Sequence, residues 1–214
     1  GVTDPQALDA PLVDLLNVRY VLSGPVGKLP GVQTVHASDL VVHRNPDALP
    51  RAFLVGEVRV EPDPRVVVRE MARAAFRPDL WAFSEVPIPG MGGAGAGAPG
   101  APPGTARLVS HEPERVEVEV EPARPALLVL ADSWYPGWKA SVDGRSEPIH
   151  RVDHALRGVV VRPGDHRVTF EYRPASFRTG STLSLAGLGL LGLGALSLAR
   201  TRGRARRPHR TETA

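Results

Sequence analysis

The chain has 214 residues, of which 42% are hydrophobic, and it contains no cysteine. This hydrophobic content excludes a wholly disordered chain and is sufficient for one or two packed domains. The lack of cysteine excludes disulfides and thiolate-bound metals.

The positive charge is concentrated at the end of the chain. Residues 200–214 carry six arginines and one acidic residue, Glu212. Residues 1–199 then hold 20 basic and 22 acidic side chains, a net charge of −2. Nucleic-acid-binding domains present a basic face, so the nearly neutral body argues against a nucleic acid as partner, and none is predicted.

The first part of the chain alternates short helices and strands. Leucines at helical spacing predict a helix that begins near Pro5, and apolar alternation predicts a strand over 18–22. Two short strands are expected on either side of Ser38-Asp39, and further strands over 51–60 and 80–86. Residues 63–76 predict a helix, with Asp63 as its N-cap and Pro64 at its first position.

Residues 88–104 are glycine, alanine or proline except for Ile88 and Met91. They include a G-x-G-x-x-G pattern at Gly95, Gly97 and Gly100. A dinucleotide site needs this pattern between a strand and a helix, whereas here it lies among prolines. We therefore expect a flexible low-complexity loop and no cofactor.

The clearest strands follow this loop. Residues 115–121 and 166–172 alternate apolar and polar side chains, which is typical of strands with one wet face. Residues 125–131 are continuously apolar, which indicates a strand buried on both faces. Asp143-Gly144 predicts a hairpin turn. Together these patterns predict a mainly β fold, an antiparallel β-sandwich with a few short helices.

Aromatic residues crowd into the segment LVLADSWYPGWKASVDG, residues 128–144. Pro136-Gly137 fits the centre of a type II turn that carries the aromatic side chains. These side chains could stack on sugars, lie among lipid headgroups, or bury their own apolar surface where the chain bends. Packing at the bend is the favoured interpretation. The candidate glycan-binding residues are Asp132, Trp134, Tyr135, Trp138 and Lys139.

No other group of residues predicts chemistry. His150 and His154 have the H-x3-H spacing of a zinc site, but the expected context is a strand and a loop rather than a helix, so no metal is predicted. The sequence lacks the G-x-S-x-G nucleophile elbow of hydrolases. We assign no catalytic residue.

Residues 182–199 contain no charge and no proline. As a helix they would extend for roughly 27 Å, close to the thickness of a bilayer core. A buried core helix or a Gly/Ala-rich tail is the alternative. The arginines that follow favour a transmembrane helix with its C-terminal end in the cytoplasm, which predicts that residues 1–180 are extracytoplasmic.

Several segments resemble the C-terminal region of the YfhO family of bacterial membrane proteins. They are residues 15–23, 49–58, 128–144 and 157–174, followed by Ser176-Phe177. The most specific is S-W-Y-P-G-W-x-A-x-V-D-G. The resemblance implies a polytopic, glycosyltransferase C-like membrane protein that uses a polyprenyl-phosphate sugar to modify cell-envelope glycans. In such enzymes the catalytic carboxylate lies in an early external loop, which this sequence does not contain.

The complete prediction divides the chain into five parts. Residues 1–87 form a mixed α/β part, 88–104 a loop, 105–180 the sandwich, 181–199 the transmembrane helix and 200–214 a cytoplasmic tail. The sequence has no initiator methionine and no signal peptide, so we expect the C-terminal portion of a longer protein of the bacterial plasma membrane. Its partners would be upstream transmembrane helices and a lipid-linked sugar or envelope glycan. The fragment would be a non-catalytic accessory domain; the alternative is a purely structural β-sandwich module without a ligand.

Overall fold

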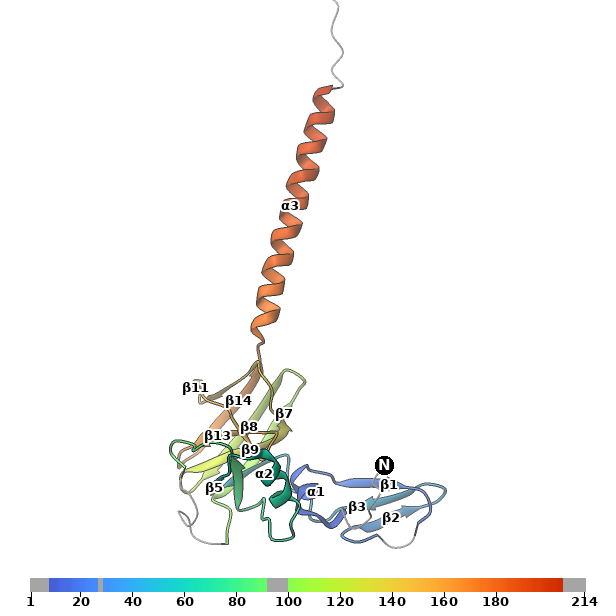
Figure 1. Cartoon of the computed structure of the whole chain (residues 1–214), viewed down its shortest axis with the longest axis vertical. Helices are drawn as coiled ribbons and strands as arrows, with labels where there is room; N and C mark the ends of the chain where they lie inside the picture. The colour runs from blue at the N-terminus through green and yellow to red at the C-terminus, as the bar shows by residue number, and fades with distance from the viewer. Residues whose placement is uncertain (1–7, 27–28, 92–99, 206–214) are drawn as a thin grey trace, which may run out of the picture. The chain divides into compact units, whose positions relative to one another are not determined.

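The computed structural model describes residues 8–26, 29–91 and 100–205, with the side chains of 175, 178 and 195–205 left out (Figure 1). Gly95 and Gly97 of the expected loop, and residues 206–214 of the expected tail, lie outside the described residues. The chain forms two compact units, Gly1–Tyr172 and Arg173–Ala214. The first is mainly β with few short helices, as predicted.

A sheet of six strands runs through the first unit. Its order is β4 (Ala52–Val55), β9 (Ala126–Ser133), β13 (Leu156–Val161), β12 (His150–Val152), β6 (Trp81–Ser84) and β5 (Glu57–Val60). All neighbours are antiparallel except β5 and β6, which are parallel. The sheet is therefore mixed, whereas the sequence predicted only antiparallel pairing. Parallel neighbours need a crossover connection, and α2 (Pro64–Met71) lies within it.

The second sheet has five antiparallel strands. Their order is β11 (Arg145–Glu147), β10 (Trp138–Val142), β14 (His166–Tyr172), β8 (Arg115–Pro122) and β7 (Gly104–His111). Val142 pairs with Arg145, so Asp143-Gly144 is a two-residue hairpin loop, as predicted. Both residues have positive φ, 50° and 78°, which is the requirement of a type I′ turn.

The two sheets enclose one hydrophobic core. Alternate residues of β8, Val116, Val118 and Val120, are buried, while the glutamates between them point outward. They meet Leu128 and Leu130 from β9 of the other sheet. Sheet-on-sheet packing of this kind confirms the sandwich-like architecture.

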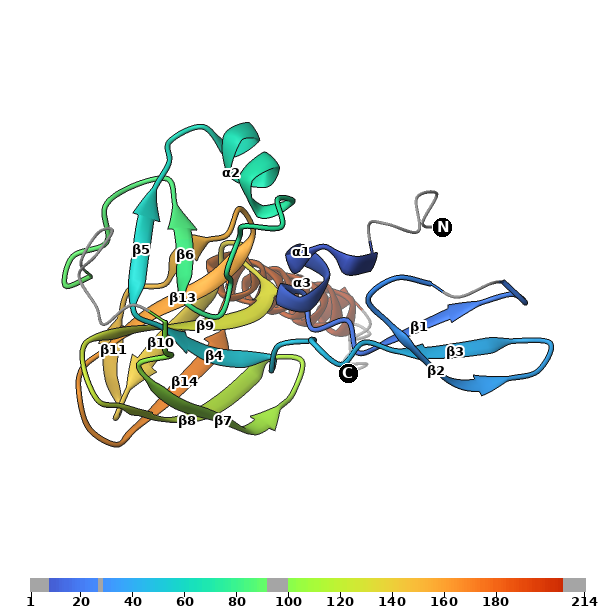
Figure 2. The same cartoon turned by 90° about the horizontal axis from the view of Figure 1, so that it is seen from below.

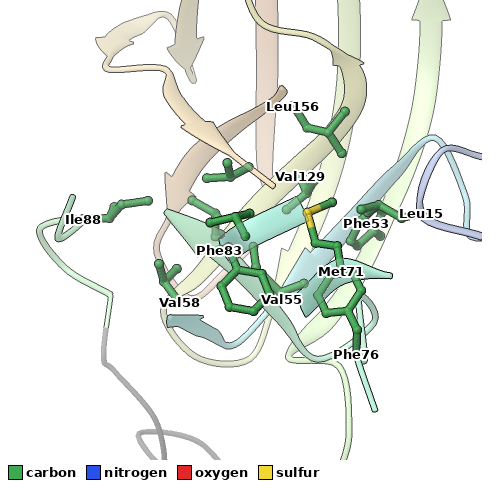
Figure 3. Close-up of a cluster of buried hydrophobic side chains, with 14 residues drawn as sticks. Leu15, Phe53, Val55, Val58, Met71, Phe76, Phe83, Ile88, Val129 and Leu156 are labelled. Atoms are coloured by element: carbon green, nitrogen blue, oxygen red, sulfur yellow. The ribbon is translucent and has the colours of Figure 1, made fainter. Parts of the chain in front are cut away.

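A second core covers the other face of the six-stranded sheet. Figure 3 shows Phe53, Val55, Phe83 and Val129 of that sheet around Met71 of α2. Strand β9 thus contributes to both cores, and this is why its sequence is continuously apolar. Helix α2 begins as predicted, because the Asp63 carboxylate accepts a hydrogen bond from the Arg65 N–H at 2.8 Å.

A three-stranded sheet, β1 (Tyr20–Ser23), β3 (Val41–Arg44) and β2 (Gln33–Ala37), forms a separate part of the first unit (Figure 2). Helix α1 (Pro11–Leu15) connects it to the second core through Leu15, which is fully buried. The Asn45 side chain donates a hydrogen bond to Asp14 in this helix at 2.8 Å. The two strands predicted around Ser38-Asp39 are confirmed as β2 and β3.

Two predicted boundaries are wrong in detail. The strand expected over 51–60 is divided at Gly56 into β4 and β5, which occupy opposite edges of the same sheet. The helix expected over 63–76 ends at Met71. Beyond it, Phe76 turns into the second core, where it stacks on Phe83 with 5.6 Å between ring centroids.

The second unit contains helix α3 (Ala175–Ala205), which has 31 residues and includes residues 182–199. Among the residues that the structure describes, no helix combines the length and the apolar character needed to cross a membrane. The membrane crossing expected for 182–199 therefore stays a prediction.

Candidate functional site at the aromatic corner

The aromatic corner consists of Trp134, Tyr135, Trp138 and Tyr172. Strand β9 ends at Ser133, and the chain turns through Pro136-Gly137 before β10 begins at Trp138. Gly137 has a φ of 109°, which an L side chain rarely adopts, so glycine suits this turn. The Trp134 N–H donates a hydrogen bond to the Ala155 carbonyl at 2.6 Å, which ties the corner to the loop before β13.

Three rings of the corner are in contact. Trp138 and Tyr172 are paired across β10 and β14, and their ring centroids are 5.5 Å apart. Tyr135 meets Tyr172 edge-on at 5.4 Å and Trp138 at 6.4 Å. These distances are typical of favourable aromatic pairs. Tyr172 was not among the predicted residues, because its place beside Trp138 depends on strand register.

Arg157 holds the centre of the corner. It is 3% exposed, and its guanidinium carbon lies 3.7 Å from the centroid of the Trp138 ring. Its Nε donates a hydrogen bond to the Ser133 carbonyl at 3.0 Å. Burial lowers the pKa of Arg157, while nearby Asp132 opposes this shift. Arg157 was not among the predicted residues, although an arginine inside the apolar run LRGVVV is a signal in the sequence.

Asp132 is enclosed by two arginines and a histidine. Its side chain is 14% exposed; it accepts a hydrogen bond from Arg51 at 2.7 Å and contacts His111 Nε2 at 3.1 Å. Arg157 Nη1 lies 4.0 Å away. A carboxylate that balances these partners has little capacity left for a ligand hydroxyl. The predicted role of Asp132 in glycan binding stays a prediction.

The outer part of the corner is more open. Tyr135 is 43% exposed, and Lys139 is exposed on β10. Trp134 is half-buried, and the Arg151 guanidinium lies 5.8 Å from its ring centroid. The structure thus divides the five candidates into an inner pair, Asp132 and Trp138, and an outer group that a ligand could reach: Trp134, Tyr135 and Lys139.

The segment with the H-x3-H spacing, residues 150–154, lies on β12 and the turn that follows it. Among the described residues, no group of three or more His, Asp or Glu side chains could hold a metal ion. His150 lies in β12, and burial lowers its pKa. The Asp153 carboxylate faces the protein interior and accepts a hydrogen bond from the Phe83 N–H at 2.8 Å.

The aromatic corner lies within a segment of the chain that matches a known protein family. Residues 106–184 run from β7 into the first turns of α3 and include all five candidate residues. This segment matches the family described as Bacterial membrane protein YfhO. The similarity to the YfhO family that the sequence indicated is confirmed over this range. Residues 15–23 and 49–58 lie outside it. No curated protein and no solved structure matches the chain.

Proposed function

We propose that this chain is the extracytoplasmic domain and the last membrane span of a longer bacterial membrane protein. The observation that carries the proposal is the match of the YfhO membrane-protein family to residues 106–184, a range that joins the sandwich to the start of α3. A family whose match continues from strands into an apolar helix supports a domain attached directly to a membrane segment.

The side chains of α3 support the membrane assignment. Six leucines between 183 and 193 are each at least 66% exposed: Leu183, Leu185, Leu188, Leu190, Leu191 and Leu193. They occupy all sides of the helix, so one partner face could not cover them. Lipid chains would cover them all, and the uncharged run to residue 199 would supply the length. The arginines that follow favour a cytoplasmic C-terminus.

The resemblance to the YfhO family extends the proposal to the parent protein. It would be a glycosyltransferase-like enzyme that modifies cell-envelope glycans with a polyprenyl-phosphate sugar, and its upstream helices would be the main partner of α3. This chain would be its non-catalytic accessory domain. The outer residues of the corner, Trp134, Tyr135 and Lys139, would supply the glycan contact, since aromatic faces and a free ammonium suit sugar rings and hydroxyls.

A purely structural module is the second candidate function, and the inner part of the corner favours it. Trp138 packs against Arg157 and Tyr172, and Asp132 is held by Arg51 and His111. These contacts are sufficient to explain why the inner residues are present without any ligand.

Topology can be tested with single cysteines, because this chain contains none of its own and any upstream cysteine can be replaced first. Asp165→Cys, at an exposed turn of the sandwich, and Arg204→Cys, after the apolar run, would be introduced singly into the intact membrane protein. In whole cells an impermeant maleimide should label position 165 and spare 204, and both should react after permeabilisation. Labelling of position 204 alone in whole cells would show the opposite orientation. Labelling of both positions in whole cells would contradict the proposed membrane span.

A further inference from the structure

A cleft of about 790 Å³ opens at the end of the sandwich where β10 ends and β14 begins. Its walls include Pro89, Pro125, Pro148 and Pro163 together with Val142 and Val160. Ligand pockets of small molecules have volumes of roughly 300–1,000 Å³. The cleft is therefore large enough for a small ligand, and the φ angles of its four prolines are fixed by their rings.

The cleft is distinct from the aromatic corner. Trp138 pairs with Tyr172 at one end of the β10–β14 ladder, and Val142 pairs with Val168 at the other. Four residue steps along a strand correspond to roughly 14 Å. The corner lies at the end where the chain leaves the sandwich for α3, and the cleft lies at the opposite end of the ladder.

Two guanidinium groups line the cleft without a salt-bridge partner among the described residues. Arg145 begins β11 and Arg162 follows β13, and both are exposed. Elsewhere most arginines are paired; Arg151, for example, is held by Glu85 at 2.5 Å. Glu147 also lines the cleft without such a partner within the described chain, and Asp143 and His166 line it as a hydrogen-bonded pair. With His166 protonated, the charged groups of the lining sum to one positive charge.

A hydrogen bond between a histidine and an aspartate links the two arginine-bearing turns. His166 Nδ1 contacts Asp143 Oδ2 at 2.7 Å, and Asp143 Oδ1 accepts a hydrogen bond from the Arg167 N–H at 2.9 Å. The contacts link the β10–β11 turn, next to Arg145, to the β13–β14 turn, next to Arg162. Both arginines therefore project from turns that are fixed relative to each other, which is the preorganisation that anion binding needs.

We propose that this cleft is a binding site for a small cyclic anion, a carboxylate or phosphate group carried on a sugar-sized ring. Arg145 and Arg162 contact the anionic group, because guanidinium donors match the geometry of both oxyanions. The proline and valine walls contact the C–H faces of the ring. The bare ion would use only the arginines, so the ring-bearing anion binds more tightly than inorganic phosphate.

The test is a titration of the full chain in detergent, followed by amide NMR and calorimetry. The probes are glucuronic acid, glucose 6-phosphate, glucose and inorganic phosphate, which separate a carboxylate from a phosphate and the ring from the charge. Arg145→Gln and Arg162→Gln each remove one charge-assisted contact and should weaken the ring-bearing anion about tenfold to a hundredfold. Arg69→Gln, an exposed arginine on α2 away from the cleft, is the matched control and should bind as the original chain does.

The amides of Val142 and Val160 should shift on binding, which locates the ligand even where affinity is low. Tighter binding of either ring-bearing anion than of glucose or phosphate, lost in both cleft variants, supports the proposal. Equal binding of inorganic phosphate would reduce the site to one for a simple ion and overturn the proposal. The proposal would also be overturned if no probe bound. It would be overturned as well if the cleft variants and the Arg69→Gln control weakened binding equally.

Discussion

Asp153 is a buried ionisable group whose protonation is linked to stability. Burial raises its pKa to about 7, although the hydrogen bond from the Phe83 N–H acts in the opposite direction. In the unfolded chain the carboxyl ionises near its ordinary value of 3.8. Since the folded pKa is the higher one, the free energy of unfolding should fall between about pH 4 and pH 7, by up to roughly 1.4 kcal/mol per pH unit.

Asp153→Asn should remove this part of the pH dependence and stabilise the fold at pH 8. Asparagine retains the acceptor for the Phe83 N–H and tolerates the positive φ of 46°. Urea denaturation from pH 5 to pH 8 measures the effect, with exposed Asp165→Asn as the control. An unchanged pH slope in Asp153→Asn would show that this carboxyl does not titrate as proposed.

The pKa of His166 is raised above its ordinary value, whereas burial lowers the pKa of His150. The hydrogen bond of His166 to Asp143 is the largest cause that raises its pKa. The pKa of Asp143 is lowered, first by the hydrogen bond from the Arg167 N–H and then by the one from His166. The stability from protonated His166 is present below its ordinary pKa of 6.5 and lost as pH rises through the raised folded value. Imidazole NMR should show this raised midpoint, and Asp143→Asn should bring it back toward the ordinary value. A midpoint at or below that value in the unmodified chain would contradict the contact.

The aromatic corner allows packing and glycan binding to be separated residue by residue. Trp138→Ala removes contacts with Arg157 and Tyr172 and should cost roughly 3 kcal/mol of stability. Trp138→Phe should cost less, because it keeps a ring there and the Trp138 indole N–H has no acceptor among the described residues. Tyr135→Ala, at a more exposed ring, should cost under about 1 kcal/mol. If the corner is a sugar platform, Tyr135→Ala should instead reduce glycan binding while melting stays unchanged.

At the scale of single elements, helix α2 depends on its first residue. The Asp63 side chain caps the helix, and Val67 and Met71 then pack on the six-stranded sheet. Asp63→Ala should destabilise the first unit by about 1 kcal/mol, whereas Asp63→Asn should retain most of the cap. Thermal melting of the two variants measures the difference. Equal loss in both would indicate that the charge of Asp63, rather than its cap bond, is what matters.

Elements with strong local signals could be predicted from the sequence. Alternation in β8 and β14, the continuously apolar β9, the Asp143-Gly144 turn and the start of α2 each follow from a few adjacent residues. The division of 51–60 into β4 and β5 could not be predicted, because both halves are apolar enough for one strand. The parallel pairing of β5 with β6 depends on where the crossover helix packs, which is a tertiary effect.

The same distinction applies to the candidate site. Trp134, Tyr135 and Trp138 were identifiable because they are adjacent in sequence around one turn. Arg157, Tyr172, Arg51 and His111 complete the corner from four other segments, so only the fold reveals that Asp132 is already occupied. Whether the corner binds a glycan is still a prediction.

At the scale of the whole molecule, residues 1–180 made as a soluble domain should fold, but they should transfer no sugar and hydrolyse no glycoside. Folding is expected because the first unit contains both hydrophobic cores and all three sheets, so burial of its apolar residues does not depend on α3. Catalysis is not expected, because Asp132 is paired with Arg51, Asp143 is hydrogen-bonded to His166 and to the Arg167 N–H, and Asp153 is buried. A general acid or base needs a carboxyl within reach of a substrate proton.

The assay uses purified domain with lipid-linked sugars and chromogenic glycosides. Turnover above background that Asp132→Asn, Asp143→Asn or Glu147→Gln abolishes would contradict the accessory-domain proposal, and the variant responsible would show whether the chemistry belongs to the corner or to the cleft.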